Sequence, residues 1–233
     1  MWRWAICLAL FSAPAVADGV VSARYDDPTT RYAHGVLGDP VEWGALVMTD
    51  GAGKTFRLTL PETRVFEDVA PRLADIDGDG LNEVVTVESD LNLGARLSVY
   101  GTAGLVAAND FIGRTNRWLA PVGVGVADLD GDGQVEFAYV DRPHLAKTLV
   151  VLRRDGARLV RVAALEGVTN HRIGEADIAG GIRDCGNGPE MIVASADWSR
   201  VLAVRFDGAR FQTEPLAQHE GRGTFRRAMA CEI

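Results

Sequence analysis

Several features that mark common protein classes are scarce in this 233-residue chain. It has three cysteines, four histidines and only two lysines, Lys54 and Lys147. Beyond its first residues it has no apolar run of about 18 residues, which a membrane-spanning helix needs, and no sustained helical periodicity. Acidic residues outnumber basic ones by 32 to 24, giving a net charge of −8. The sequence therefore excludes a membrane span, disfavours nucleic-acid partners and favours a chain built of strands.

Catalytic motifs are also missing. The segment Gly53-Lys54-Thr55 looks like the end of a P-loop, but Met48 stands where the first glycine belongs and a strand follows. No Gly-x-Ser-x-Gly elbow is present, although triads can assemble from distant residues. The histidines lack metal-binding spacing and are expected to be solvated singly; they are His34, His144, His171 and His219. The sequence favours a non-enzymatic protein without excluding an enzyme.

The first 17 residues have the pattern of a bacterial signal peptide. Arg3 supplies a positive charge, residues 5–11 form a short apolar core, and Ala15-Val16-Ala17 is a small-x-small cleavage site. The mature chain is expected to begin at Asp18 and to be periplasmic or secreted.

Removal of this leader leaves two cysteines, Cys185 and Cys231. An even pair in an oxidising compartment predicts a disulfide; two separate buried thiols are the alternative.

A repeat of about 52 residues runs through the mature chain. Gly-containing turns between apolar stretches fall near positions 50, 102, 155 and 207, a pattern typical of β-hairpins. A glutamate opens a β-rich stretch at Glu83, Glu136 and Glu190, and Glu42 is interpreted as a worn first copy. A regular repeat of this length indicates supersecondary units that bury their faces by stacking.

The predicted fold is all-β, a small β-propeller of about four four-stranded antiparallel blades in a single domain, 18–233. Radial stacking leaves only short, protected sheet edges. A five-bladed ring is the alternative count, and a β-sandwich or an open β-solenoid are the alternative folds, although a two-sheet sandwich gives no reason for the period. The blades are expected at 18–60, 61–113, 114–165 and 166–216, with a closing strand in 217–233.

Two segments carry carboxylates at alternate positions followed by glycine. Positions 1, 3, 5 and 9 of each hold oxygen ligands, and position 7 would offer a backbone carbonyl, the donor type that Ca²⁺ prefers. Neither loop has the glutamate at position 12 that an EF-hand requires. The predicted ligands of two structural Ca²⁺ sites are Asp75, Asp77, Asp79, Leu81 and Glu83, and Asp128, Asp130, Asp132, Gln134 and Glu136.

This spacing resembles the FG-GAP/VCBS repeats of bacterial surface proteins and integrin α-chains. The resemblance rests on 73–80 and 126–133, and it implies a propeller with structural Ca²⁺ in the blades but no particular activity. Worn copies are expected near Asp39 and at Asp177–Gly181, where ligand positions are replaced. Cys185 lies by the second of these, so a bridge to Cys231 is predicted to hold blade four as metal holds blades two and three.

The sequence thus predicts an exported, Ca²⁺-stabilised scaffold, expected as a monomer, that binds a protein or polysaccharide partner through its loops. A periplasmic or secreted hydrolase or lyase on the same scaffold is the alternative function. Carboxylates or histidines gathered away from the Ca²⁺ loops would favour the enzyme.

Overall fold

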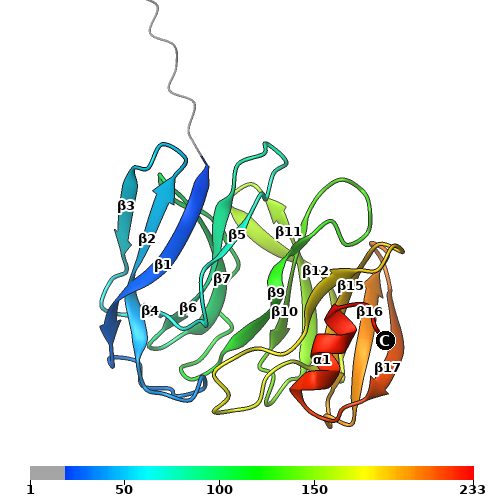
Figure 1. Ribbon diagram of the computed structural model, residues 1–233. Coiled ribbons are helices and arrows are strands. Elements are labelled where there is room, and N and C mark those ends of the chain that lie inside the picture. Colours follow the sequence, from blue (N-terminus) through cyan, green and yellow to red (C-terminus); the bar gives the residue numbers. More distant parts are fainter. Residues whose placement is uncertain (1–18) are drawn as a thin grey trace, which may run out of the picture.

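The structure of the protein is a computed structural model that describes residues 19–233 (Figure 1). The predicted leader, 1–17, and its cleavage site lie outside the described residues. Strands dominate residues 19–233, which confirms the all-β prediction, and within this range one short helix follows them. The elements are β1 (Val20–Thr29), β2 (Glu42–Asp50), β3 (Thr55–Thr59), β4 (Arg64–Phe66), β5 (Arg72–Ala74), β6 (Glu83–Asp90), β7 (Gly94–Gly101), β8 (Gly104–Ala108), β9 (Leu119–Ala127), β10 (Glu136–Asp141), β11 (Thr148–Asp155), β12 (Arg158–Glu166), β13 (Val168–Thr169), β14 (Gly181–Asp184), β15 (Pro189–Ser195), β16 (Arg200–Phe206), β17 (Phe211–Gln218) and α1 (Arg222–Met229).

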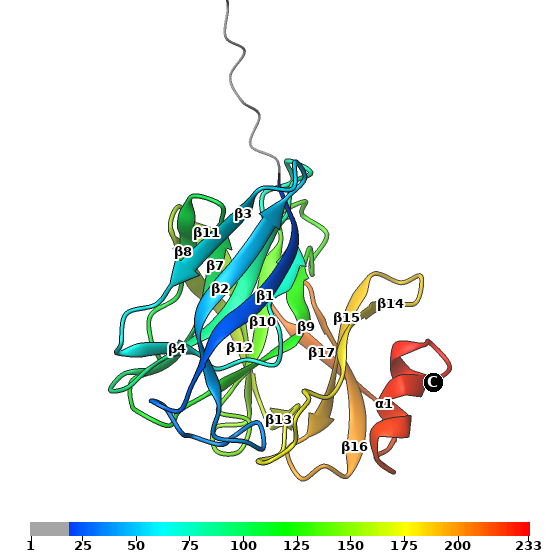
Figure 2. The same ribbon diagram turned by 60° about the vertical axis from the view of Figure 1, so that its left-hand side comes forward.

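The strands form four antiparallel units in chain order. Unit one is β1–β3, unit two is β5–β8, unit three is β9–β12 and unit four is β14–β17. Because β4 bridges β2 and β6, and β8 touches β12 in one parallel pair, units one to three join into a twelve-stranded sheet, whereas unit four and β13 form a five-stranded one. Figure 2 shows the units arranged side by side in a curved arc.

The core lies between successive units because the central strands are apolar on both faces. Along β10, Phe137 and Tyr139 pack into the cluster shared with unit two, and Ala138 and Val140 pack into the cluster shared with unit four. Alternate residues of a strand point to opposite faces, so one continuous apolar run serves two interfaces. Full burial of each large side chain contributes roughly 1.5–3 kcal/mol.

The last segment of the chain is helical, so the prediction of a closing strand in 217–233 is wrong. Strand β17 ends at Gln218 and α1 follows. Phe225 and Ala228, three residues apart on one helical face, are buried against Ile192 and Ala194 of unit four. Helical spacing, not strand alternation, brings these apolar residues together. Helix α1 therefore covers the outer face of unit four.

Unit one is built differently from its neighbours, and the interpretation of Glu42 as a counterpart of Glu83 is wrong. Glu83 opens β6 beside the connection 75–82, at the upper end in Figure 1. Glu42 opens β2, and its neighbour Trp43 pairs through β4 with residues at the other end of β6. The cause is the long connection 30–41, which carries the chain from β1 to β2. We call the end with the connections 75–82 and 128–135 the carboxylate end, and the opposite one the far end.

No helix in the described part of the chain combines the length and the apolar character needed to cross a membrane.

Candidate metal centres

Two carboxylate loops occupy the same position in units two and three. Each connects the first and second strands of its unit, with Ala74 opposite Glu83 in one and Ala127 opposite Glu136 in the other. The first aspartate directly follows the first strand of the unit (β5 or β9), and the glutamate is the first residue of the second strand (β6 or β10). The hairpin register therefore brings the two ends of each loop together.

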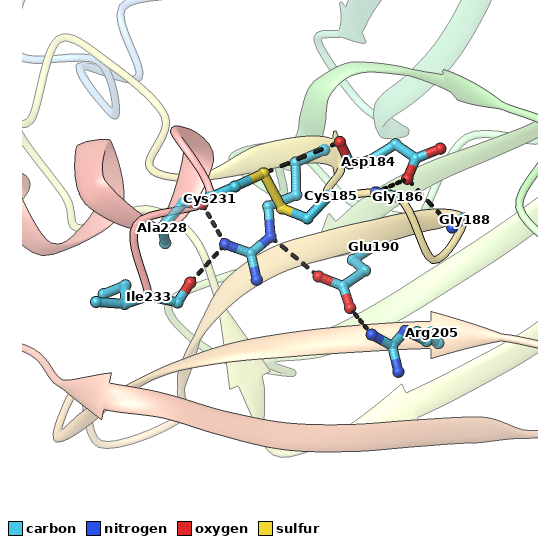
Figure 3. The surroundings of a disulfide bond; sticks show 10 residues. Asp184, Cys185, Gly186, Gly188, Glu190, Arg205, Ala228, Cys231 and Ile233 are labelled. Atoms are coloured by element: carbon cyan, nitrogen blue, oxygen red, sulfur yellow. Dashed lines mark hydrogen bonds and ion pairs between the residues drawn. A yellow bond between two sulfur atoms is a disulfide. The ribbon is translucent and has the colours of Figure 1, made fainter.

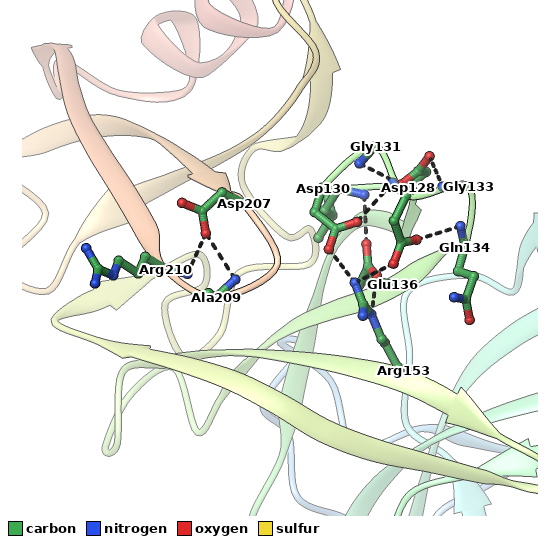
Figure 4. A network of polar contacts seen from close by, with 12 residues as sticks. Asp128, Asp130, Gly131, Gly133, Gln134, Glu136, Arg153, Asp207, Ala209 and Arg210 are labelled. Carbon is green, nitrogen blue, oxygen red and sulfur yellow. Dashed lines mark hydrogen bonds and ion pairs between the residues drawn. The ribbon is translucent and has the colours of Figure 1, made fainter.

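In each loop three carboxylates converge. Oxygens of Asp75, Asp77 and Glu83 lie within 4.8 Å of one another, as do oxygens of Asp128, Asp130 and Glu136. Within residues 19–233 these are the groups in which three or more potential ligands approach so closely. Three of the five predicted ligands of each loop are thus brought together, and Figure 4 shows the second group.

Backbone N–H groups shape each loop around its first aspartate. Asp75 accepts hydrogen bonds from the N–H groups of Gly78 at 2.7 Å and Gly80 at 2.9 Å. In the second loop, Asp128 accepts from Gly131 and Gly133 in the same way, at 2.8 and 3.0 Å. All four glycines have positive φ, between 78° and 85°, a conformation that favours glycine. These N–H groups, that of Gly80 foremost, lower the pKa of Asp75.

The remaining predicted ligands lie outside the two groups of three. Asp79 accepts a hydrogen bond from the Leu81 N–H, and Asp132 accepts one from the Gln134 N–H, each at 2.8 Å. These bonds fix the turn that precedes the glutamate. The roles of the Leu81 and Gln134 carbonyls as ligands remain predictions.

The electrostatics of the first loop suit a cation. Burial raises the pKa of Glu83, and the nearby carboxylates of Asp77, Asp79 and Asp75 raise it further. A bound cation would offset this mutual repulsion. The donors are all oxygens, which suits hard cations such as Ca²⁺, Mg²⁺ or Mn²⁺. Either loop could therefore hold a metal ion.

Arginines already pair with both loops. Arg153 donates through Nε to Glu136 at 2.6 Å, lies 3.2 Å from Asp132 and also pairs with Asp130 (Figure 4). Burial raises the pKa of Glu136, and Arg153 opposes that effect. Arg154 reaches across to unit two, where it lies 3.2 Å from Asp77. A guanidinium thus pairs with carboxylates that a cation would need in both loops. Arg153 pairs with three carboxylates of the second loop, whereas Arg154 pairs with one carboxylate of the first.

Unit four has a shortened counterpart of these loops, and the sequence placed it wrongly. Arg183 lies opposite Glu190, as Ala74 lies opposite Glu83. Asp184 accepts from the N–H groups of Gly186 at 2.7 Å and Gly188 at 3.1 Å, like the first aspartates of the other loops. The worn loop predicted at Asp177–Gly181 instead leads into β14, which begins at Gly181. The true counterpart escaped the pattern because it is two residues shorter and has lost the intervening aspartates.

Two arginines and a disulfide surround the glutamate of this shortened loop. Glu190 pairs with Arg183 at 3.0 Å and with Arg205. Arg183 also donates to the Ile233 carbonyl at 2.8 Å and to that of Ala228. The Cys185–Cys231 disulfide, which confirms that prediction, ties the loop to the segment after α1 (Figure 3). It also indicates an oxidising compartment.

The worn copy predicted near Asp39 is wrong as well. Asp39 lies in the connection 30–41 at the far end, where it accepts a hydrogen bond from the Val41 N–H at 2.8 Å. Within residues 19–233, unit one has no loop equivalent to the two carboxylate loops, because the connection 30–41 joins its first two strands at the far end.

The far end carries a polar cluster that no local pattern in the sequence indicates. His34 Nδ1 lies 2.5 Å from the buried carboxylate of Glu67, and His144 Nε2 lies 3.0 Å from His171 Nδ1. Trp118 joins the two pairs, because its Nε1 donates to the Glu67 carbonyl at 2.7 Å and its ring packs on His171 at 4.9 Å. The expectation of solitary, solvated histidines is therefore wrong for these three. Their wide separation along the chain left no local signal.

Compared with known proteins, the chain matches no protein-family model and no curated sequence. The resemblance to FG-GAP/VCBS repeats thus rests on the two loops and the repeat period of the sequence.

Proposed function

We propose that the protein is an exported, calcium-binding β-propeller scaffold of the FG-GAP/VCBS type that binds a partner through its loops. The observation that carries the proposal is the construction of one carboxylate loop twice, at the same hairpin register, starting at Asp75 and again 53 residues later at Asp128. A surface turn has no need for such repetition. In this proposal each antiparallel unit is a blade.

Calcium is the favoured ion because each loop offers carboxylates together with backbone turns that can supply further oxygens. Its role would be structural, since the loops join the two inner strands of a unit. The disulfide supports export, and the predicted leader provides the route. The partner would be a protein or a polysaccharide, bound by a monomer.

The test is the thermal melt of residues 18–233 in EDTA and in increasing Ca²⁺. A ligand that binds only the folded state raises the melting temperature by mass action. We expect a Ca²⁺-dependent rise that shrinks in Asp77→Ala and in Asp130→Ala, and that stays intact in the control Asp110→Ala, whose side chain is 88% exposed. No rise in the wild-type protein would refute the proposal.

A second candidate, a hydrolase or lyase, is favoured by one observation, the His34–Glu67 pair at the far end. Glu67 is fully buried; its carboxylate accepts a hydrogen bond from the Ser89 hydroxyl and pairs with His34 Nδ1. Such a carboxylate orients a histidine whose other nitrogen can act as a base. Screening polysaccharide and phosphoester substrates with wild-type protein and His34→Gln tests it; activity equal in both would reject this role.

A further inference from the structure

The groove between the two carboxylate loops is lined by two arginines, which a structural metal role does not explain. It has a volume of about 430 Å³ and is lined by Asp75, Asp77, Gln134, Arg153, Arg154 and Gly156, among others. Unit two supplies one wall and unit three the other. Arg153 and Arg154 thus line a groove that has Asp75 and Asp77 of the first candidate centre on one side and residues 133–135 of the second loop on the other.

Both arginines are engaged by residues that a cation would need. Arg153 pairs with Glu136 and Asp130 of the converging group, and Arg154 pairs with Asp77. A divalent cation and a guanidinium repel each other and compete for the same oxygens. Cation binding in the loops would therefore release both arginine side chains.

The released side chains would remain at the groove because their backbone is fixed. Both residues belong to β11, just before the turn at Gly156, and β11 is paired on both sides, with β10 and β12. About a third of each side chain is already exposed, 29% for Arg153 and 30% for Arg154. Each planar guanidinium suits bidentate recognition of an oxyanion.

Cation binding would also make the formal charge around the groove less negative, which favours an anionic ligand. The eight carboxylates of the two loops and the two arginines that pair with them carry a formal charge of −6. Two divalent cations would reduce it to −2. Anions, which the empty loops repel, could then approach the groove.

We propose that this groove is a binding site for a ligand bearing oxyanion groups, held by Arg153 and Arg154, and that cation binding in the two loops opens it. The inference rests on the proposed function, since it requires that the loops bind Ca²⁺. It gives the metal a second role, as the switch that frees the arginines. By linkage, the ligand must tighten Ca²⁺ binding by the same factor.

The experiment measures binding of a heparin-derived hexasaccharide to residues 18–233 by calorimetry, in Ca²⁺ and in EDTA at equal ionic strength. We expect at least tenfold tighter binding in Ca²⁺. The double variant Arg153→Gln/Arg154→Gln should lose this gain and keep its Ca²⁺-dependent rise in melting temperature, which shows that it folds. Arg158→Gln, on the adjacent strand β12 and 69% exposed, is the matched control and should behave as the wild type does.

Two results would overturn the inference while leaving the calcium proposal standing. One is a Ca²⁺-dependent melting rise with equal hexasaccharide affinity in Ca²⁺ and EDTA. The other is undiminished Ca²⁺-dependent binding by the double variant, which would mean that the metal holds the anion itself. Absence of any melting rise would refute both proposals together. Competition by inorganic sulfate distinguishes a small free anion, which displaces the hexasaccharide at millimolar concentration, from a polymer that needs several contacts.

Discussion

Arg153 Nε lies 2.6 Å from Oε1 of Glu136, so the second carboxylate loop contains its own competitor for a cation. Among the described residues, the first loop has one such pair, the more distant one between Arg154 and Asp77, at 3.2 Å. The two loops share a sequence pattern, yet they should differ in metal affinity because of a residue outside the pattern.

Substitution of Arg153 by glutamine should strengthen Ca²⁺ binding at the second loop. In an Asp77→Ala background, which restricts binding to that loop, we expect affinity to rise about tenfold, or about 1.4 kcal/mol. In EDTA the same variant should melt at a lower temperature, because Asp130 and Glu136 lose their partner. Calorimetric Ca²⁺ titration and melting curves measure the two effects. Unchanged affinity would show that Arg153 does not compete.

The Cys185–Cys231 disulfide should contribute strongly to stability. It joins residues 46 apart, and closing a loop of that length is worth about 4 kcal/mol in the chain-entropy model. The variant Cys185→Ala/Cys231→Ala should therefore melt about 8–16 °C lower than the oxidised protein. Hydrogen exchange should show α1 opening first, since the bridge holds the segment that follows it.

A reductant provides the control for this prediction. It should lower the melting temperature of the wild-type protein and leave that of the double variant unchanged. Equal melting temperatures of the oxidised wild type and the variant would contradict the assignment of a stabilising role.

Features that depend on a single loop or strand could be predicted from local sequence patterns. Strands β6 and β10 begin at Glu83 and Glu136, and β15 begins one residue before Glu190, at Pro189, because a stretch of β-branched and aromatic residues after a turn is a local signal. The even cysteine count likewise predicted the disulfide. The loop at Asp184 escaped because its role is set by the register with Glu190, which a deletion had shifted out of the pattern.

Contacts between distant segments could not be predicted in this way. The sequence predicts a strand where the structure has helix α1, because the apolar residues of α1 find their partners only in the distant strands of unit four. The contact between His34 and Glu67 depends on the connection 30–41 folding over the far end, and no spacing encodes it. The pairing of Arg153 with Glu136 is an intermediate case. Arg205 and Glu190 form the same pair in unit four, so the sequence repeat could have revealed it.

Glu42 should destabilise the protein at alkaline pH. It is 2% exposed, and burial, together with Glu67, Asp39 and Asp68, raises its pKa to about 9. A pKa raised above the unfolded value of about 4.3 means that the stability present below that pH is lost as the pH rises toward 9. Glu42→Gln keeps the shape without the charge, so it should stabilise the protein at pH 8 and have little effect at pH 4.

Urea unfolding at both pH values measures the difference. Glu62→Gln is the matched control, because the Glu62 side chain is 92% exposed, and its effect should not depend on pH. An equal effect of Glu42→Gln at pH 4 and pH 8 would show that this carboxyl group titrates normally in the folded protein.

The pair His144–His171 should make the protein sensitive to acid. Burial lowers the pKa of His144 to about 4, with help from His171 and His34, and burial also lowers that of His171. His171 Nε2 lies 2.8 Å from the Glu175 carbonyl, so it carries the proton there and accepts one from His144 at Nδ1. Protonation of His171 at Nδ1 would break that bond. The neutral forms are therefore the folded forms.

Because the folded pKa of His144 lies below the unfolded value of about 6.5, the unfolded chain binds more protons between these values. Stability is then full above about pH 6.5 and falls as the pH drops toward 4. His144→Gln can still donate to His171 but cannot titrate, so near pH 5 it should reduce proton uptake on unfolding by about one proton. Melting temperatures from pH 4.5 to 7.5 measure this: the curve of the variant should be flatter than that of the wild type, with His171 supplying the remaining slope. Parallel curves would mean that His144 does not titrate differently in the folded and unfolded states, and that the far-end cluster does not sense acid through this pair.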